Sequence, residues 1–402
     1  MTPAPLVRFI STYENPTSYY RDLIPSLAEH GFAVDVLMSR TEYRGGRGPL
    51  EEAIAHDRVS VSRVWSPARM ASSPIRKVMA MITFMLGAVR RTLQGPPAAV
   101  NIFFTTPPLF ALWGIVLQSL GRGTCCAMIM DIYPDVLVAD GRLPHDGVMT
   151  RVLSAAARLV WRRASAVVVI GRDMEQLVLG SGAPPERVHV IRNWAHEATR
   201  EAPPTESNGL REELGLTEEF VVSYVGNFGV SHTFDEVLEV AEQLCDRDDL
   251  TFVFVGEGAR RPQLADAAAR LRNVYLLPFQ PESRLIEALR LGNVNLVTLR
   301  PEFAGLVVPS KAYGALAAGR PLLYVGPRDS ELALVVTDLA VGVQTEPGHS
   351  DGLLSAVERL RDEPSMAAAM GERAAFVARE DFGVERALRS WSELLGTLAA
   401  SG

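Results

Sequence analysis

The sequence predicts an α/β protein with doubly wound parallel sheets, and three observations lead to this fold class. Short runs rich in β-branched and aromatic residues alternate with helical patterns almost throughout the 402 residues. These runs are apolar on both faces, which is typical of strands covered by helices on both sides. A polar, proline-bearing segment at 194–209 separates two halves, each with enough strands for one Rossmann-like sheet.

In the first half, the apolar runs predict strands at 7–10, 33–38, 59–64, 98–104, 124–130 and 166–170. Helical patterns predict helices at about 17–30, near 75–93, after Pro107 and near 147–163. The longest apolar stretch, 102–120, is interrupted by Pro107 and Pro108. This interruption suits a strand, a turn and a helix better than a membrane span.

In the second half, we expect strands at 220–226, 250–256, 273–279, 294–299 and 321–326. Helices are expected near 233–245, after Gly258, near 282–291, from Pro309 and in the closing segment. The predicted organisation is an N-terminal domain at 1–195, a linker at 196–209, a C-terminal domain at 210–380 and a last helix at 381–402 that packs back on the first domain. Ligands on such sheets sit at the carboxyl ends of the strands, so two facing domains would form a cleft.

Composition and charge exclude several classes of protein. Hydrophobic residues make up 48% and charged residues 22%, which is typical of an ordinary globular protein. The net charge of −7 argues against general nucleic-acid binding. The three cysteines, two of them adjacent, do not suit a disulfide framework, so we expect reduced thiols in the cytoplasm. No secretory signal is visible at the start, and the histidines have no ligand-like spacing, so no metal site is expected.

Three strand ends in the second half suit phosphate. YVGNFG (224–229) and VGEG (255–258) place glycines at strand-to-helix turns, where backbone amides can approach a phosphate closely. The third strand end leads to Lys311, which follows Pro309 and Ser310 at a helix start. Ordinary tight turns and a solvated lysine are the alternatives. Together the three predict a diphosphate over the carboxyl edge of the second sheet.

The ordered set of motifs resembles a known family. YVGNFGVSHTFDEVLEVAEQL, FVFVGEGARRPQL, NVYLLPFQP and PSKAYGALAAGRP have the order and spacing of family-four nucleotide-sugar-dependent glycosyltransferases, which have the GT-B fold. In the first half, SLAEHGFAVDVL, TTPPL, MDIYPDVLVADG and VIGRDMEQLVLGSGAPPERVHVIRNW are similar too. Within the family, the chain is most similar to bacterial transferases of the colanic-acid and O-antigen type.

The resemblance implies transfer of a hexosyl or N-acetylhexosaminyl group from a nucleoside diphosphate sugar, with a UDP-sugar favoured, to a saccharide hydroxyl. It also implies retention of configuration, no metal and no other cofactor. Lys311 and Asp131 are the implied catalytic residues: Lys311 binds the diphosphate oxygens, and Asp131 accepts the acceptor's proton or supports the developing positive charge. A helix or turn cap is the alternative for Asp131.

The resemblance also implies two sets of binding residues. The donor set, which includes those beneath the diphosphate and around the nucleobase, comprises Gly226, Asn227, Gly229, His232, Glu257, Arg260, Pro278, Phe279, Glu302, Gly305, Pro309, Ser310 and Tyr313. The acceptor set comprises Tyr13, Thr17, Ser18, Thr105 and Thr106.

The chain departs from the family pattern at its usual acidic pair. Leu306 and Gly314 stand where the family has two glutamates, the second of which holds the ribose. That contact would come from Glu302, Tyr313 or main chain. The usual arginine and lysine after the first glycine loop are replaced by Asn227 and His232, which leaves much of the phosphate charge to Lys311 and Arg260. Thr17 and Ser18 replace a glycine pair often found in the acceptor loop.

Two basic, apolar helices leave two explanations open. Segments 75–93 and 151–164 combine arginines with apolar residues, as do helices that lie on anionic lipid. They equally suit core helices with solvated ends. If they contact lipid, the acceptor is expected to be linked to polyprenyl diphosphate, and the protein to act at the inner face of the cell membrane.

Two other functions fit the same pattern. A non-hydrolysing nucleotide-sugar epimerase also has two Rossmann-like domains, and would convert a donor without an acceptor. A nucleotide-binding subunit without catalysis would fit the missing acidic pair.

Overall fold

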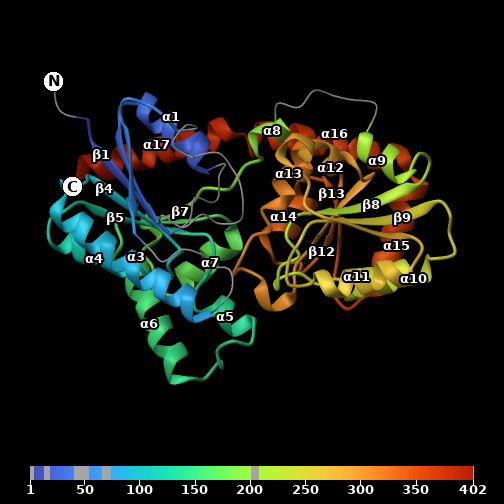
Figure 1. The fold of residues 1–402 in the computed structure, drawn as a ribbon, viewed down its shortest axis with the longest axis horizontal. Helices are drawn as coiled ribbons and strands as arrows, with labels where there is room; N and C mark the ends of the chain where they lie inside the picture. The colour runs from blue at the N-terminus through green and yellow to red at the C-terminus, as the bar shows by residue number, and fades with distance from the viewer. Residues whose placement is uncertain (1–3, 13–18, 40–53, 66–73, 201–207, 402) are drawn as a thin grey trace. The chain divides into compact units, whose positions relative to one another are not determined.

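The computed structural model describes residues 4–12, 19–39, 54–65, 74–200 and 208–401 (Figure 1). The chain forms two compact units. Unit 1 comprises Met1–Arg192 together with Val384–Gly402, and unit 2 comprises Asn193–Gly383. The last helix, α17 (Val384–Ser401), therefore belongs to unit 1, where it packs against α1 (Ile24–Glu29).

Unit 1 holds a seven-stranded sheet with the order β3-β2-β1-β4-β5-β6-β7, and every pair of neighbours is parallel. Its strands are β1 (Leu6–Ser11), β2 (Ala33–Ser39), β3 (Val59–Val64), β4 (Val100–Phe104), β5 (Thr124–Ile129), β6 (Ala166–Val169) and β7 (Val188–Val190). The first six lie where the sequence predicts them. β7 was not predicted, because three residues are too few to give an apolar run.

Helices cover both faces of this sheet, with α1 and α17 on one side and α3, α4 and α6 on the other (Figure 1). Besides α1 and α17, the helical segments are a π-helical turn (Tyr19–Leu23), α3 (Pro74–Gln94), α4 (Ala111–Ser119), α5 (Asp135–Ala139), α6 (Val148–Arg163), α7 (Arg172–Gly180) and a 3₁₀ turn (Pro185–Arg187). Of the single helix expected over 17–30, residues 17 and 18 lie outside the described residues, and the rest is the π-helical turn followed by α1.

Unit 2 holds a six-stranded parallel sheet with the order β10-β9-β8-β11-β12-β13. Its strands are β8 (Phe220–Val225), β9 (Leu250–Val255), β10 (Val274–Leu277), β11 (Val294–Thr298), β12 (Leu322–Val325) and β13 (Gly342–Thr345). β13 was missed, because GVQT is short and only partly buried and gives no apolar run.

The helical segments of unit 2 are α8 (Glu197–Arg200), α9 (Gly209–Leu214), α10 (Asp235–Gln243), α11 (Arg261–Arg270), a 3₁₀ turn (Glu282–Arg284), α12 (Leu285–Arg290), a 3₁₀ turn (Pro301–Phe303), α13 (Lys311–Ala317), α14 (Glu331–Asp338), α15 (Ser350–Asp362) and α16 (Pro364–Glu380). The helix expected from Pro309 therefore begins two residues later, at Lys311. Ser310 is the residue before this helix, and its side chain makes no capping hydrogen bond.

The core of unit 2 shows why its strands are apolar throughout. Alternate residues of a strand point to opposite faces of the sheet. In β9, Phe252 and Phe254 pack in a core cluster with residues of α10, α11 and α15, while Val253 and Val255 pack in another with residues of α9 and α12. Both faces are buried, which confirms the predicted doubly wound α/β class.

The strand order marks one position in each sheet where a ligand would bind. In unit 2 the chain moves outward from β8 in one direction and from β11 in the other, so the connections diverge between these neighbours. In unit 1 the same reversal lies between β1 and β4. Open α/β sheets bind ligands at the carboxyl ends of the strands at such a reversal.

Two further expectations concern the cysteines and the long apolar segment. Cys125 and Cys126 are buried in β5 and Cys245 is partly buried, and all three are unpaired thiols. Burial raises the pKa of Cys126 to about 12, so this thiol stays protonated at neutral pH. Within the described residues, no helix combines the length and the apolar character needed to cross a membrane.

Candidate functional site

Lys311 lies at the reversal in the sheet of unit 2. It opens α13, which the chain enters after β11, and its side chain reaches the loop that follows β8. β8 and β11 are the neighbours between which the strand order reverses. The lysine and the first glycine loop, which are more than eighty positions apart in the sequence, therefore meet where a ligand of this fold is expected.

The Lys311 ammonium group is surrounded by neutral acceptors. Its Nζ donates to the Tyr224 hydroxyl, lies 3.3 Å from the Asn227 carbonyl oxygen and lies 2.8 Å from His232 Nε2. It also lies 4.2 Å from the centre of the Tyr224 ring. Among the described residues, no carboxylate forms an ion pair with Lys311. The alternative of a lysine pointing to water is therefore wrong.

Each acceptor around Lys311 is itself held in place. The Tyr224 hydroxyl donates to the Asn227 carbonyl oxygen at 2.9 Å, so toward Lys311 it acts as an acceptor. His232 Nδ1 lies 2.5 Å from the carbonyl oxygen of Thr298, the last residue of β11. Nδ1 therefore carries the proton, and Nε2 presents its lone pair to Lys311.

Burial shifts the pKa values of this group toward neutral forms. The pKa of Lys311 is well below its usual value, because burial disfavours the charged amine. The pKa of His232 is also well below its usual value, first through burial and then through the neighbouring Lys311. The pKa of Tyr224 is well above its usual value through burial. An incoming anion would favour the ammonium form of Lys311.

The two glycine loops next to Lys311 fit against each other. A Cβ added to Gly256 would lie 1.9 Å from the Gly226 carbonyl oxygen, and one added to Gly258 would lie 2.4 Å from the Phe228 carbonyl oxygen. The φ angles of Gly226, Gly256 and Gly258 are +138°, +153° and +152°, which side chains rarely permit. Glycine is therefore required here both by space and by backbone conformation.

Other predicted donor residues lie in loops at the same edge of the sheet, after β8, β9 and β10. Asn227 is exposed and Gly229 is half-buried in the first glycine loop. Arg260 precedes α11, and its amide donates to the Phe228 carbonyl oxygen at 3.0 Å. Pro278 and Phe279 follow β10 and are exposed, with 47% of Phe279 accessible. The Glu257 carboxylate is engaged by Arg261 at 2.9 Å, so it is already paired.

The remaining predicted donor residues are buried, exposed or already paired with another side chain. Gly305 and Pro309 are buried, Ser310 is exposed, and Glu302 is paired with Arg300 at 3.4 Å. The expectation that Tyr313 contacts the ribose is not supported by its position. Tyr313 is only 4% exposed, and its ring packs edge-on against Phe382 with 5.3 Å between centroids.

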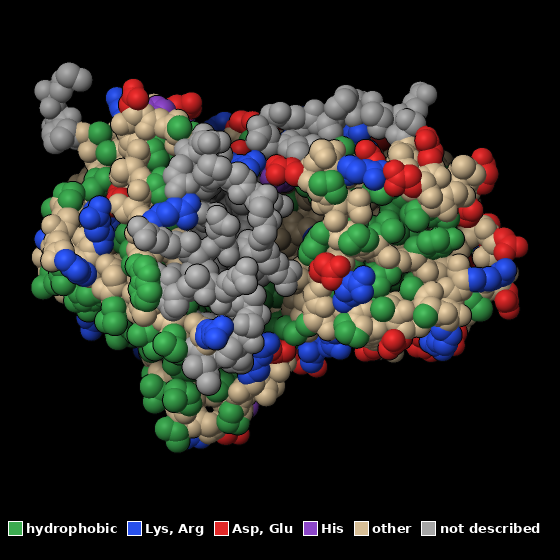
Figure 2. Space-filling view, in the orientation of Figure 1, with side chains coloured by type: hydrophobic (Ala, Val, Ile, Leu, Met, Phe, Trp, Pro, Cys, Tyr) green, Lys and Arg blue, Asp and Glu red, His purple; other side chains and the backbone are tan. Residues whose placement is uncertain are grey.

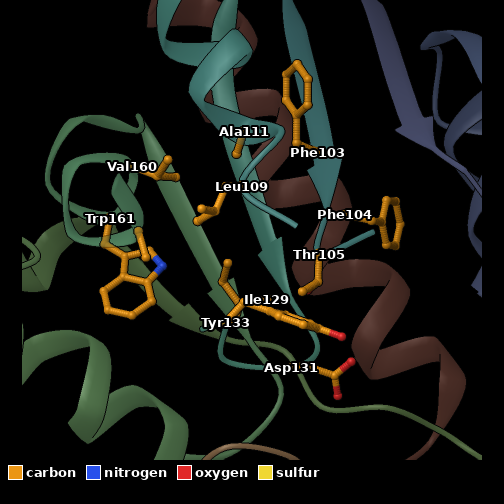
Figure 3. Close-up of a pocket in the computed structure, with 11 residues that line it drawn as sticks. Phe103, Phe104, Thr105, Leu109, Ala111, Ile129, Asp131, Tyr133, Val160 and Trp161 are labelled. Carbon is orange, nitrogen blue, oxygen red and sulfur yellow. The ribbon is translucent and has the colours of Figure 1, made fainter. Parts of the chain in front are cut away.

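Asp131 follows β5 in unit 1, at one end of a small apolar pocket (Figure 3). The other lining residues are Phe103, Phe104, Thr105, Leu109, Ala111, Ile129, Tyr133, Ala157, Val160 and Trp161. This apolar surrounding raises the pKa of Asp131 to about 6 by desolvation. A carboxyl group with such a pKa can gain and lose a proton near neutral pH, as a general base must.

The predicted acceptor residues give a mixed result. The Thr105 hydroxyl donates to the Met128 carbonyl oxygen at 3.2 Å and accepts from the Met130 amide at 2.8 Å. These bonds tie β4 to the end of β5 and give Thr105 a structural role, and its expected role toward the acceptor stays a prediction. Thr106 precedes a cis proline, and its carbonyl oxygen accepts from the Thr12 amide at 3.2 Å. Tyr13, Thr17 and Ser18 lie outside the described residues.

Sequence reasoning missed Tyr224 and Arg300. Tyr224 lies within an apolar strand and looks like an ordinary core residue in sequence. Arg300 links the ends of β8 and β11, because its amide donates to the Ser231 carbonyl oxygen at 2.9 Å and its Nη1 to the Val230 carbonyl oxygen at 3.2 Å. Neither residue has a signal in the sequence. Lys311 has one, because of 40 basic residues only Lys77 and Lys311 are lysines. A chain that otherwise uses arginine keeps a compact ammonium group here.

Comparison with known protein families decides the class of the molecule. Residues 16–194 match the model of the glycosyl transferase 4-like domain, and residues 219–363 match that of glycosyl transferases group 1. The chain belongs to the family-four glycosyltransferases. The resemblance drawn from the motifs is thereby confirmed.

Named relatives of the glycosyltransferase include WbjE of Pseudomonas aeruginosa, described as a probable glycosyltransferase. The two are 27% identical over 297 residues, which cover 73% of this chain and 72% of WbjE. WcaI of Escherichia coli (strain K12), whose name assigns it to colanic acid biosynthesis as a glycosyl transferase, is 26% identical over 267 residues. That match covers 64% of this chain and 65% of WcaI.

Solved structures share the fold of the glycosyltransferase. HepE of Anabaena, crystallised in complex with UDP, superimposes with a TM-score of 0.72 at 15% identity, over 98% of this chain and all (100%) of that one. WaaG, a glycosyltransferase involved in lipopolysaccharide biosynthesis, gives a TM-score of 0.69 at 16% identity, over 97% of this chain and 99% of that one. With the two parallel sheets, these similarities confirm the predicted GT-B fold.

Proposed function

We propose that the glycosyltransferase moves a sugar from a nucleoside diphosphate sugar to a saccharide hydroxyl, with retention of configuration and without a metal. The observation that carries this proposal is the setting of Lys311. Its amine lies at the strand reversal of unit 2 among three neutral acceptors and no paired carboxylate of the described residues. A diphosphate is the partner that such a cation lacks.

In this reaction the bond between the anomeric carbon and the diphosphate oxygen breaks, and its electron pair leaves with the diphosphate. Lys311 would stabilise the charge that develops there. Hydrogen-bond donors and cations held in place before the reaction lower the barrier most, because they need no reorganisation. The bonds of Tyr224 and His232 to the main chain supply such fixed surroundings for the amine.

The nucleobase is proposed to lie beside Phe279. This ring is exposed directly after β10, at the same edge of the sheet as the glycine loops. An exposed aromatic face offers stacking to a planar base. UDP is the favoured nucleotide, and the complex of HepE with UDP supports this choice.

The acceptor is proposed to bind at unit 1, with Asp131 taking the proton of the attacking hydroxyl. The raised pKa of Asp131 and its place at the end of β5 support this role. We further propose that the transferred group is a hexosyl or N-acetylhexosaminyl group. The acceptor would be linked to polyprenyl diphosphate, and the enzyme would act in the cytoplasm at the inner face of the membrane.

Calorimetric titration of the full chain with UDP, GDP and dTDP, without metal, tests the donor site. We expect micromolar binding of one nucleotide, lost in Lys311→Ala and kept in Lys77→Ala, the chain's other lysine. With a donor sugar in hand, Lys311→Ala should lose roughly 100- to 1000-fold in turnover. Absence of binding for all three nucleotides, or normal turnover in Lys311→Ala, would remove Lys311 from the mechanism.

Product analysis separates the proposed transfer from its two rivals. An epimerase would convert the nucleotide sugar with no acceptor present. A non-catalytic subunit would bind the nucleotide and leave the sugar unchanged in both cases. Transfer predicts a new glycoside only when acceptor is added.

A further inference from the structure

Three neighbouring helices of unit 1 turn apolar side chains outward. On α3 the exposed residues are Val78, Met79, Ile82, Leu86 and Leu93, between 43% and 65% accessible. On α6 they are Val148, Met149, Val152 and Leu159, between 45% and 78% accessible, and at α4 they are Val116 and Leu120. These residues are here called the apolar face. They make up most of the large exposed hydrophobic residues in the described chain, so they are not a random scatter.

The three helices lie side by side. Trp113 Nε1 of α4 donates to Thr92 Oγ1 of α3 at 2.9 Å, and α4 packs against α6. Figure 2 shows hydrophobic side chains gathered over α6, at the lower end of this unit. The apolar face is therefore spread over adjoining helices on one side of the sheet.

The core does not account for these residues. On α3, Ala80, Phe84 and Ala88 recur every four residues and are buried against the sheet. Ile82 and Leu86 stand on a different stripe of the same helix and are 50% and 65% exposed. An outward stripe of a surface helix is usually polar. An apolar outward stripe therefore indicates a binding partner other than the core of unit 1.

The charged residues within the three helices of the apolar face are all basic. The chain has 47 acidic residues and a net charge of −7, yet none of the acids lies between Asp57 and Asp131, where eight residues are Lys or Arg. Another acid-free stretch runs from residue 147 to 172 and contains five arginines. These two stretches include all of α3, α4 and α6.

Several of these arginines lack an acidic partner. Arg151, Arg158 and Arg163 of α6 are exposed, and no ion pair joins any of them to a carboxylate of the described residues. At the end of α3, Arg90 donates to Gln94 and Arg91 to Ser62, which are neutral. Among the described residues, no carboxylate therefore pairs with these arginines, which lie beside the apolar residues.

We propose that the apolar face and its arginines dock the protein on an anionic lipid bilayer. The apolar side chains would enter the boundary between headgroups and acyl chains, and the arginines would contact lipid phosphates. A second copy of the chain fits this surface poorly, because two like faces would bring arginines against arginines. The proposal rests on this surface alone and stands apart from the proposed reaction.

Flotation of the full-length protein with vesicles tests the proposal. We expect binding to vesicles that contain phosphatidylglycerol, and binding to pure phosphatidylcholine that is weaker by roughly tenfold or more. Binding should also weaken as the salt concentration rises from about 50 to about 500 mM. Leu86→Asp combined with Val152→Asp should reduce binding at least roughly tenfold. Arg158→Gln combined with Arg163→Gln should reduce binding and its salt dependence.

Phe376→Asp is the matched control. Phe376 of α16 is 48% exposed and lies near Arg379, but it belongs to unit 2. This variant should bind vesicles like the unchanged protein. Equal binding to neutral vesicles, or no effect of Leu86→Asp with Val152→Asp, would overturn the proposal. So would a dimer in sedimentation that this double variant dissociates, because the face would then bind a second copy. Nucleotide binding and the melting temperature report separately on folding and on the donor site.

Discussion

Lys311 Nζ and His232 Nε2 lie 2.8 Å apart, and the other ring nitrogen of His232 is held by the Thr298 carbonyl oxygen. The histidine thus joins the lysine to the end of β11. Since its pKa is well below the usual value, it stays neutral and acts as an acceptor near neutral pH. We interpret His232 as a positioning residue for Lys311, which refines the expectation that it binds the donor directly.

Two substitutions separate the two bonds of His232. In His232→Gln the longer amide can reach the Nε2 position and accept from Lys311, whereas in His232→Asn the shorter amide can reach only the Thr298 carbonyl oxygen. We expect His232→Gln to keep kcat/KM within about tenfold, and His232→Asn to lose a further factor of about ten, near the value of one hydrogen bond. Steady-state kinetics on both variants measure the difference.

The pH profile gives the control for this prediction. Because His232 does not titrate near pH 6.5, its replacement should leave the shape of the profile unchanged between pH 6.5 and 8, a window set by the ordinary histidine pKa. If the two variants were equally active, or if a histidine step disappeared in both, the positioning role would be wrong.

Lys311 is expected to take up a proton when a diphosphate binds. In the empty protein burial lowers its pKa well below 10.5, so part of the amine is neutral at high pH. A bound diphosphate favours the ammonium form and raises that pKa. Above the pKa of the empty protein, binding therefore consumes a proton, and affinity for the nucleotide falls as the pH rises.

Carbon-13 labelling of lysine Cε makes this titration visible, because the chain has only two lysines. Lys77→Arg removes one signal and assigns the other to Lys311. We expect its midpoint to lie below that of free lysine without nucleotide and to move upward with UDP. Identical midpoints with and without UDP would show that the amine does not face the diphosphate.

The sequence predicts the fold well because its signals are local. A strand such as β9 is buried on both faces, so it is apolar at every position, and the glycines after β8 and β9 mark where loops approach each other. β13 was missed because it is short and partly polar. The signals fail where a strand carries no such pattern.

The candidate site could be predicted only in part. Lys311 stood out by its sequence context, but its acceptors lie 79 to 87 positions away, and no local pattern indicates such contacts. For the same reason His232 was predicted as a ligand of the donor, although it is 7% exposed, and Tyr313 was predicted at the ribose, although it packs on Phe382. Whether such a residue is buried depends on tertiary packing, which the residue type alone does not indicate.

Asp131 is expected to set the acidic limit of activity. With a pKa of about 6, it is protonated below this pH and cannot accept a proton. We expect kcat/KM to fall about tenfold per pH unit below about pH 6, and Asp131→Asn to lose roughly 100- to 10,000-fold at pH 7.5. Asp135→Asn, at an exposed position four residues on, is the control and should keep normal activity.

The same carboxyl group gives an opposite result for stability. Its folded pKa is raised above the ordinary value of 3.8, so its ionisation costs the folded state stability as the pH rises through about 6. Asp131→Asn removes this cost. We expect the variant to be more stable at pH 7.5 by at most about 3 kcal/mol, with the difference vanishing below pH 4. Thermal unfolding at both pH values measures this, and a less stable variant at pH 7.5 would contradict the assigned pKa.

The contact between the glycine loops predicts a sharp effect of one methyl group. Gly256→Ala would place a Cβ 1.9 Å from the Gly226 carbonyl oxygen, at a φ of +153° that alanine tolerates poorly. The loop after β8 must then move, and with it the backbone beside the Lys311 side chain, which lies 3.2 Å from the Cβ position of Gly226. We expect a loss of roughly 2–4 kcal/mol in unfolding free energy, from strain and overpacking together, and weaker nucleotide binding.

Gly352→Ala is the matched control in the same unit. Gly352 lies in α15, and a Cβ added there meets nothing within 4 Å. Alanine favours a helix over glycine, so this variant should gain about 0.5–1 kcal/mol and keep its nucleotide affinity. Denaturant unfolding and calorimetric titration of both variants provide the comparison. If Gly256→Ala matched Gly352→Ala in both measurements, the two loops would not be in contact. The backbone beneath the proposed diphosphate site would then not be held in a fixed conformation by that contact.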